Sequence, residues 1–513
     1  MSTTNTYDSE KAPASTAVST HSDERTLGHA EPPSEQQQPQ AQQSPELDPD
    51  LVDWDGPDDP ENPQNWTKAK KWRLIAILGL VTLVTPLGSS FFAPGVPQVM
   101  ADFHESSNII ASLVVSIYIF GFAIGPLIIA PMSELYGRFW IYNACNVLFV
   151  IFSVCCGVSN SMGMLIAFRL LAGAAGAAPL TIGGGTVADI FPPAERAGAM
   201  AIWSVGPLLG PVLGPVAGGF LVEAEGWRWV YWVLVIAAGL FTILFYFVGS
   251  ETYHPTILAA KAARLRKETG NQNLRSKLAL DIPPRAIFTR SIVRPMKMLF
   301  LSPIVLLTST YVAIYYGIMY QFFTTLTFVF EGQYHFSSGM VGLSYLGLGG
   351  GLLVGMGFLG VMSDKIVKRQ QAVGDMKPEH RLDLLLSVPG AILLPAGVFI
   401  YGWTTQYQIH WIVPILATAF VGYGNLTALM TIQTYLIDAF TIHAASAVAA
   451  NTVLRSIFGA FLPLSGLALF DKLGLGWGNS LLAFIALALL PVPVAFRFYG
   501  ERIRTNPRFT TKF

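Results

Sequence analysis

The sequence carries little charge for its length. Of its 513 residues only 12% are Asp, Glu, Lys or Arg, whereas 52% are hydrophobic. Soluble chains carry about 25% charged residues, so this chain lacks the polar surface that several soluble domains would need. Its formal net charge is zero, which by itself says nothing about partners; the distribution of its basic residues, given below, leads us to expect no nucleic-acid partner.

The sequence also lacks the residues of most enzyme and pump classes. The three cysteines, Cys145, Cys155 and Cys156, fall within one apolar stretch, so they form neither a disulfide framework nor a zinc-binding pattern. No two histidines stand close enough for an HExxH motif, and no Gly-Lys dipeptide is present for the phosphate-binding loop of an ATP-driven pump. We expect no metal site, no cofactor and no enzymatic activity.

Long apolar stretches are abundant. A stretch of about 20 apolar residues can cross a hydrocarbon core of about 30 Å, and only helices of this kind satisfy their own backbone in lipid. The pattern predicts an all-α integral membrane protein with twelve transmembrane helices in two six-helix halves. The predicted spans are residues 74–95, 109–131, 140–157, 163–189, 198–222, 229–249, 302–325, 338–362, 382–402, 411–437, 446–470 and 479–498.

Basic residues are distributed unequally between the predicted loops. With both termini in the cytoplasm, the outer loops hold only Arg228 and Lys472. Such an excess of Lys and Arg on the inner side is typical of membrane proteins and predicts this orientation. The inner loops and ends hold Lys68, Lys70, Lys71, Arg138, Arg196, Lys261, Arg264, Arg266, Lys267, Lys365, Lys368, Arg369, Arg502 and Arg504.

The chain divides into five predicted segments. Residues 1–70 form a disordered cytoplasmic tail, since their first 50 residues are rich in Gln, Pro, Ser and Glu. Residues 71–250 and 301–498 form the two six-helix halves, joined by the cytoplasmic central loop 251–300 and followed by the cytoplasmic tail 499–513. Two similar halves indicate an internal duplication.

Two short sequences support this duplication. The stretch GPLIIAPMSELYGR, with Glu134 and Arg138, follows the second span, and GFLGVMSDKIVKR, with Asp364, follows the eighth. Both place a carboxylate just past a helix end that carries glycine, with basic residues after it.

The stretch GPLLGPVLGPVAGG in the fifth span repeats glycine every fourth residue. Glycines at this spacing share one helix face, where a neighbouring helix can approach closely in lipid, and the prolines remove backbone donors and bend the helix. The pattern is open to two interpretations: ordinary close packing, or a bent helix that shapes the interface between the halves. Its residues are Gly206, Pro207, Gly210, Pro211, Gly214, Pro215, Gly218 and Gly219.

These motifs resemble known transporter motifs. GPLIIAPMSELYGR resembles the loop motif of the major facilitator superfamily, RLLAGAAG from Arg169 onwards its helix 4 motif, and GPLLGPVLGPVAGG its exporter motif in helix 5. WRWVYW at residues 227–232 and GSETYHPTIL after the sixth span resemble the fungal drug:proton antiporter family with twelve spans. The resemblance implies a multidrug or metabolite efflux pump that exports drugs, toxins or secondary metabolites by proton antiport.

The resemblance also implies roles for single residues. It assigns proton coupling to Arg169, and gating or coupling to Glu134, Arg138, Asp189 and Asp364. From the residues alone, a buried arginine in a span favours a functional role, and the alternative for Arg169 is a structural pair with a backbone carbonyl. No acidic residue stands near the middle of a span, where a proton carrier is expected, so the coupling mechanism stays open.

In this fold helices 1, 4, 7 and 10 line a central cavity. The cavity candidates are Tyr311, Tyr315, Gln321, Asn425 and Arg455; for Arg455 a structural and a substrate-binding role are both open, and for the tyrosines packing is the alternative. An aromatic and weakly polar cavity suits a bulky amphipathic molecule.

Two further functions stay open at this stage. One is import or export of a specific small organic acid or polyamine, although the cavity offers a polyamine no carboxylate. The other is a transporter-like sensor that moves nothing. We expect a monomer in the plasma membrane, with the vacuolar membrane as the alternative, whose partners are a small organic substrate, protons and the lipid bilayer.

Overall fold

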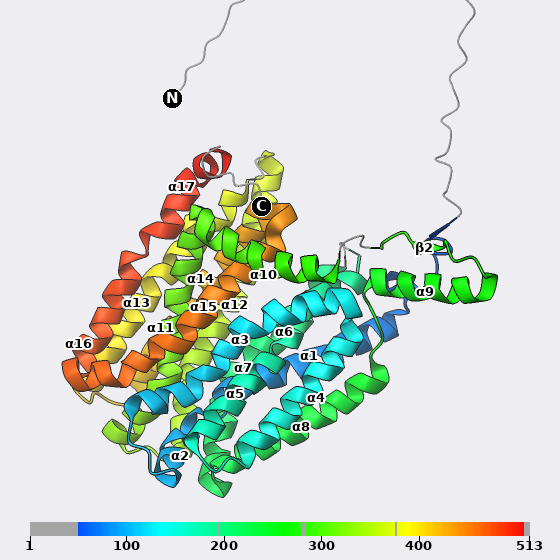
Figure 1. Ribbon diagram of the computed structural model, residues 1–513. Coiled ribbons are helices and arrows are strands. Elements are labelled where there is room, and N and C mark those ends of the chain that lie inside the picture. Colours follow the sequence, from blue (N-terminus) through cyan, green and yellow to red (C-terminus); the bar gives the residue numbers. More distant parts are fainter. Residues whose placement is uncertain (1–49, 193–194, 280–282, 375–376, 507–513) are drawn as a thin grey trace, which may run out of the picture. The chain divides into compact units, whose positions relative to one another are not determined.

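The computed structural model describes residues 50–192, 195–279, 283–374 and 377–506, which are mainly helical (Figure 1). The first half of the chain forms α1 (Lys68–Ser90), α2 (Val96–Asp102), α3 (Asn108–Tyr136), α4 (Arg138–Gly157), α5 (Met162–Gly176), α6 (Ala178–Ile190), α7 (Arg196–Glu225) and α8 (Trp227–Val248). The middle of the chain forms α9 (His254–Thr269) and α10 (Pro284–Leu301), and two short strands, β1 (Leu51–Val52) and β2 (Arg275–Ser276), pair with each other.

The remaining helices are α11 (Pro303–Tyr334), α12 (Ser338–Val373), α13 (Leu384–Gln406), α14 (Ile412–Phe440), α15 (Ala444–Phe461), α16 (Gly466–Ala488) and α17 (Pro491–Thr505). Short 3₁₀ turns, η1 to η5, cover Pro63–Asn65, Ala93–Gly95, Pro378–Leu382, Thr441–His443 and Leu462–Ser465. We call residues 68–248 the N-terminal half and residues 303–505 the C-terminal half.

Eleven helical runs in the described residues are long and apolar enough to cross a membrane. The last run, Ala444–Thr505, has 62 residues, and at 1.5 Å per residue it is far too long for one crossing. Gly474 divides it, with φ +73° and ψ 169°, and beyond this break Gly478 comes back against Phe470. Divided there, the run supplies two spans, and each of the twelve predicted spans coincides with a helical run.

The outer surface of the bundle is apolar. Phe247 is 79% exposed, and Ile236 and Val354 are each 65% exposed. Such a surface is unfavourable in water unless another molecule covers it, whereas lipid chains solvate it directly. The polar groups of the spans lie inside instead, including Thr82, Ser116 and Thr308, which are fully buried.

The segment between residue 50 and α1 is folded, although the sequence placed it in a disordered tail. β1 pairs in parallel with β2 beyond α9, and the ring of Trp54 lies 5.8 Å from that of His254. Lys261 of α9 is 3% exposed and its Nζ lies 3.0 Å from Asp59 and 2.7 Å from Asp55. We call residues 50–67 the strap; the earlier part of the predicted tail, residues 1–49, lies outside the described residues.

The ion pair of the strap shifts both partners toward their charged forms. Burial alone would raise the pKa of Asp59, but hydrogen bonds from the amides of Asp55 and Glu61 and from Lys261 outweigh it and lower that pKa. Burial likewise opposes the charge of Lys261, but its two carboxylate partners raise its pKa. The strap is therefore held by charge as well as by backbone pairing.

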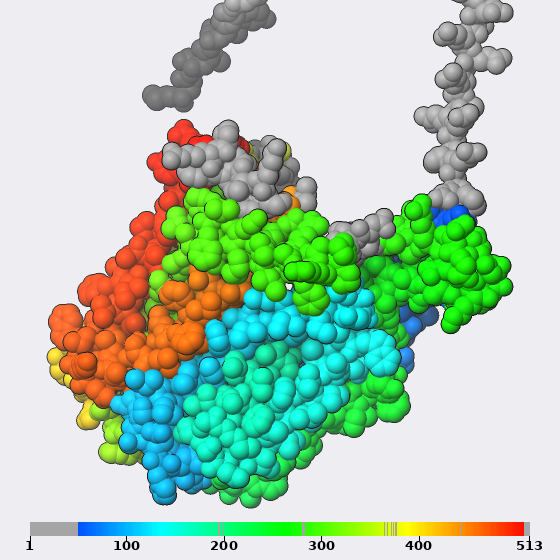
Figure 2. Space-filling model, viewed as in Figure 1, coloured from blue at the N-terminus to red at the C-terminus, as the bar shows by residue number. Residues whose placement is uncertain are grey.

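The amphipathic helix α10 lies across the seam between the halves. It packs against α15 and α11 of the C-terminal half and against α3 of the N-terminal half, and Figure 2 shows it lying across the upper ends of the cyan and orange helices. We call this end of the bundle the loop end and the opposite end the far end. The two halves also meet where α7 packs on α12 and α3 packs on α15.

Candidate functional site

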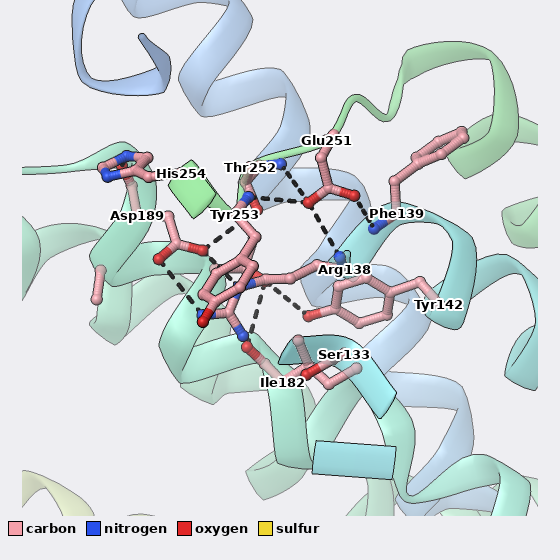
Figure 3. Close-up of polar contacts among 12 residues, drawn as sticks. Ser133, Arg138, Phe139, Tyr142, Ile182, Asp189, Glu251, Thr252, Tyr253 and His254 are labelled. Carbon is pink, nitrogen blue, oxygen red and sulfur yellow. Dashed lines mark hydrogen bonds and ion pairs between the residues drawn. The ribbon is translucent and has the colours of Figure 1, made fainter. Parts of the chain in front are cut away.

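Arg138 and Asp189 form the centre of a polar cluster at the loop end of the N-terminal half (Figure 3). We call Arg138, Asp189, Glu251, Thr252 and Tyr253 the loop cluster. Arg138 begins α4 and Asp189 lies at the end of α6. Nε of Arg138 donates to Oδ2 of Asp189, and Nη2 of Arg138 donates to Oδ1 at 3.4 Å. The side chains are only 13% and 15% exposed, so this charged pair fixes the start of α4 to the end of α6.

Glu251, in the segment after α8, caps the first turn of α4. Its carboxylate accepts from the backbone N–H groups of Arg138 at 2.9 Å and of Phe139 at 3.1 Å. It also accepts from the N–H groups of Thr252 and Tyr253 at 2.9 and 2.8 Å. Unpaired N–H groups and the helix dipole both stabilise a carboxylate there, so Glu251 ties the end of the sixth span to the start of the third.

The rest of the cluster closes around this cap. Gly137 has φ +87°, and a Cβ there would stand 2.3 Å from Oε2 of Glu251, so this position requires glycine. The guanidinium of Arg138 lies 5.0 Å from the centre of the Tyr253 ring. Burial and the charge of Glu134 raise the pKa of the Tyr253 hydroxyl above its ordinary value of 10.0, so this hydroxyl stays protonated.

A similar ion pair stands at the loop end of the C-terminal half. Arg381, in η3, donates from Nε to Asp438 at the end of α14 at 2.6 Å, and its Nη1 lies 3.5 Å from Oγ of Ser363. Nearby, Glu379 is 3% exposed and accepts from Arg504 at 3.2 Å. In each half, an arginine before or at the start of the third span thus pairs with an aspartate at the end of the fourth.

The sequence identified only part of this arrangement. Of the four predicted gating residues, the structure brings together Arg138 and Asp189. Glu134 is exposed and forms no ion pair within 4 Å with a described residue, although it interacts electrostatically with Arg138 and with Arg290 of α10. The side chain of Asp364 lies outside the described part of the structure. The sequence reasoning missed Glu251, whose only signal was its place in the run GSETYHPTIL.

The glycine face of α7 packs against α1 of the same half. At Gly206, Gly210, Gly214 and Gly218, a Cβ would stand between 2.0 and 2.8 Å from α1 or its C-cap Phe91. Glycine lets the two backbones touch, which is how close helix packing arises in lipid. Pro207, Pro211 and Pro215 lie within α7 without interrupting it.

Another face of α7 makes the contact between the halves. A Cβ at Gly219 would stand 2.4 Å from the carbonyl of Ser338, and one at Gly342 would stand 2.5 Å from the carbonyl of Pro215. At Gly349 it would meet Val212 at 2.4 Å. Of the predicted motif, Pro215 and Gly219 therefore lie at the interface between the halves, whereas the four-residue glycine repeat does not.

Contacts between the halves continue at the far end. Glu223 accepts from Oγ of Ser337 at 2.9 Å and from the N–H of Gly339 at 2.7 Å, and Asn108 donates to Asp471 at 2.7 Å. The described halves are thus held together along α7 and α12 at the far end.

Arg169 is 1% exposed and its bonding partners lie in its own half. Its guanidinium donates to the hydroxyl of Tyr231 at 3.0 Å and to the carbonyls of Ser89 and Val115 at 3.3 and 3.2 Å. It also lies 4.9 Å from the centre of the Phe92 ring. Arg169 thus joins α5 to α1, α3 and α8 without a carboxylate, which is the structural geometry that the sequence left open.

The tyrosines of α11 form two ring pairs with different neighbours. The rings of Tyr311 and Tyr315 lie 4.5 Å apart, and the hydroxyl of Tyr315 donates to the carbonyl of Ala391 on α13 at 3.1 Å. This pair packs inside the C-terminal half, in agreement with the packing alternative, and its lining of the central cavity stays a prediction. The rings of Tyr316 and Tyr320 lie 4.9 Å apart, and the hydroxyl of Tyr320 reaches the N-terminal half.

The second pair lies in a chain of contacts between two arginines. The hydroxyl of Tyr320 lies 3.5 Å from Oγ of Ser89, whose carbonyl accepts from Arg169. At the other end, the guanidinium of Arg455 on α15 lies 5.1 Å from the centre of the Tyr316 ring. We call Arg169, Ser89, Tyr320, Tyr316 and Arg455 the arginine–tyrosine chain.

The other cavity candidates are buried. Asn425 is 3% exposed and Gln321 is 1% exposed, and neither amide atom of Gln321 has a hydrogen-bond partner among the described residues. Gln321 packs against Gly466 at the start of α16. No group of three or more His, Cys, Asp or Glu side chains among the described residues is arranged to hold a metal ion.

Comparison with known proteins agrees with this architecture. The family model described as the Major Facilitator Superfamily matches residues 78–463. The MFS-type transporter penM of Penicillium rubens is 55% identical over 467 residues, which are 91% of this chain and 92% of that protein. The efflux pump radE of Floropilus chiversii is 53% identical over 470 residues, 91% of this chain and 87% of its own length.

Solved structures share the fold at low sequence identity. A bacterial homologue of the human lysosomal transporter Spinster, in an inward-facing and unoccupied conformation, has a TM-score of 0.61 and 15% identity, covering 85% of this chain and 98% of its own. A D-xylose–proton symporter has a TM-score of 0.60 and 16% identity, covering 87% and 100%.

Proposed function

Because the chain belongs to the major facilitator superfamily, we propose that it is a secondary active transporter that exports amphipathic organic molecules such as secondary metabolites, toxins or drugs. It is a multi-pass membrane protein. Two observations carry the proposal. The chain folds into two six-span halves that meet along α7 and α12, and a fungal relative that is 53% identical over most of its length is named an efflux pump.

The architecture suits alternating access, in which two halves rock about a site between them. The halves touch at the far end through α7 and α12, where Gly219 and Gly342 permit close approach. The loop cluster and the Arg381–Asp438 pair each bind together the loop-end parts of one half. We therefore propose that each half moves as a rigid unit and that these ion pairs keep its loop end intact during the movement.

We further propose that the loop end faces the cytoplasm of a fungal cell, that the protein lies in the plasma membrane as a monomer, and that it is not an enzyme. The basic residues at the loop end support this orientation. Proton antiport stays a prediction: Arg169 is buried and is bonded by carbonyls and a hydroxyl, and no acidic side chain of the described spans lies at its depth.

The test is an untargeted comparison of culture media from strains with and without the protein. Export predicts a set of amphipathic compounds that accumulate in the medium of the parent strain and are retained in cells of the deletion strain. A strain that expresses Gly214→Leu at normal abundance serves as the inactive match, because a side chain there would collide with Ser90. Identical media and cell contents in all strains would contradict export and favour the sensor.

A further inference from the structure

The two arginines inside the spans have unlike surroundings. Arg169 has three hydrogen-bond partners. Arg455, inside α15, is half-buried and makes no hydrogen bond or ion pair with any described residue; its Nε, like that of Arg169, is buried without a partner. Its contact with the Tyr316 ring is a cation–π contact, which compensates a partly buried charge only in part.

The interior near Arg455 contains no compensating negative charge. The acidic residues of the described spans whose side chains are described, such as Glu134, Asp189 and Asp438, stand near helix ends. A charged side chain at membrane depth is costly unless it is paired, and it marks a substrate or ion pathway. With two positive charges and no negative one, the centre of the bundle favours an anion.

The position of Arg455 is suited to a ligand between the halves. The ring of its partner Tyr316 contacts that of Tyr320, whose hydroxyl reaches Ser89 of the N-terminal half. Asn451, one turn earlier on α15, is 1% exposed and its amide oxygen has no partner. Aromatic rings beside an unpaired guanidinium can hold an apolar body and an acidic group together.

We propose that Arg455 binds the single negative charge of an amphipathic organic acid, a carboxylate or an acidic enol, and that the substrate crosses as its anion. This inference rests on the proposed function and names its substrate class. One unpaired guanidinium recognises one charge, since Arg169 has its own partners. Tyr316 and Tyr320 cover the apolar body of the acid.

An anionic substrate also determines the driving force of transport. The potential of a cell whose interior is negative drives an anion outward, and each 60 mV or so raises the equilibrium ratio of a monovalent anion about tenfold. A transporter of this kind needs no side chain that carries a proton across. The absence of acidic residues at mid-depth then follows from the chemistry of the substrate.

The experiment uses the full chain in proteoliposomes. An organic extract from a culture of the fungus that encodes the chain is divided by anion exchange into an acidic and a neutral fraction. Each fraction is offered at equal pH on both sides, with an inside-positive potential set by a potassium gradient and valinomycin. Mass spectrometry then identifies the compounds taken up.

The proposal predicts that the imported compounds are acids and that their uptake rises with the potential. Arg455→Gln lowers this uptake at least tenfold, whereas Arg455→Lys, which keeps the charge, retains part of it. Arg502→Gln, at an exposed position near the end of α17, transports like the parent.

Other results distinguish a failure of the anion inference from a failure of the proposed function. Uptake of neutral or basic compounds that Arg455→Gln leaves unchanged overturns the inference and leaves the proposed function standing. Uptake of acids that is the same with and without the imposed potential overturns transport as the anion. No uptake from either fraction by the parent protein overturns the proposed function, and the inference falls with it.

Discussion

Replacement of Gly218 by alanine tests the packing of α7 on α1 at its tightest point. A Cβ there would stand 2.0 Å from the carbonyl oxygen of Phe91, 2.9 Å from its ring and 3.0 Å from its carbonyl carbon. The nearest obstacle is backbone, so no side-chain rotation relieves the overlap. An ordinary contact begins at 3.4 Å, and the two backbones must therefore separate locally by about 1.4 Å.

The energetic cost follows from two opposing effects. Extra volume in a packed interior destabilises by about 1–3 kcal/mol, and alanine in place of glycine inside a helix stabilises by up to about 1 kcal/mol. At Gly218 the overlap with backbone dominates, and we expect a net loss of about 1–3 kcal/mol in the free energy of unfolding. Gly239→Ala on α8 is the matched control, because nothing lies within 4 Å of its Cβ.

The assay is unfolding of both purified variants in a mixed-detergent titration, together with transport at equal protein amount. Gly218→Ala is expected to unfold at lower denaturing detergent and to transport poorly, while Gly239→Ala equals or exceeds the parent in stability. Equal stability and equal transport of the two variants would refute the close-packing account of the glycine face.

Three further predictions follow from the other sites. Glu251→Gln weakens a carboxylate that accepts four backbone N–H bonds and should cost about 1–2 kcal/mol of stability; detergent unfolding checks this, and Glu225→Gln, exposed at the end of α7, should cost nothing measurable. Arg169→Lys should lose stability because a lysine does not reproduce the planar guanidinium fork on Tyr231 and the two carbonyls, and stability equal to the parent would contradict its structural role. Amide exchange in β2 should show constant protection between pH 5 and 9. Protection is lost only as pH falls below 3.8, the ordinary pKa of Asp59, toward its lowered pKa, or as pH rises beyond 10.5, the ordinary pKa of Lys261, toward its raised pKa. A loss of protection inside that window would contradict the buried pair.

The spans were predictable because hydrophobic length alone identifies them. In lipid a 20-residue apolar run is stable only as a membrane-spanning helix, whichever neighbours the run contacts. The break at Gly474 shows the same principle, since it lies beside the charged residues Asp471 and Lys472, between two apolar runs. The strap was missed because its Pro, Asp and Asn content indicates disorder, whereas its order comes from the distant Lys261.

The orientation of individual side chains was less predictable. Tyr311 and Tyr316 are five residues apart, about 140° around a helix, so they belong to different ring pairs with different neighbours. The sequence showed that a glycine face exists but not which helix it meets, because that depends on the tertiary arrangement. Likewise, the three hydrogen-bond partners of Arg169, one hydroxyl and two carbonyls, lie in three other helices and leave no local signal.

The most direct test of the central claim is transport in sealed vesicles of known orientation. A compound that only the parent strain secretes is offered to inside-out and right-side-out plasma-membrane vesicles under an imposed potential. The account predicts uptake into inside-out vesicles, where the loop end faces the compound, and no such uptake when the chain is absent or carries Gly214→Leu. Equal uptake into vesicles with and without the chain would contradict its role as an exporter.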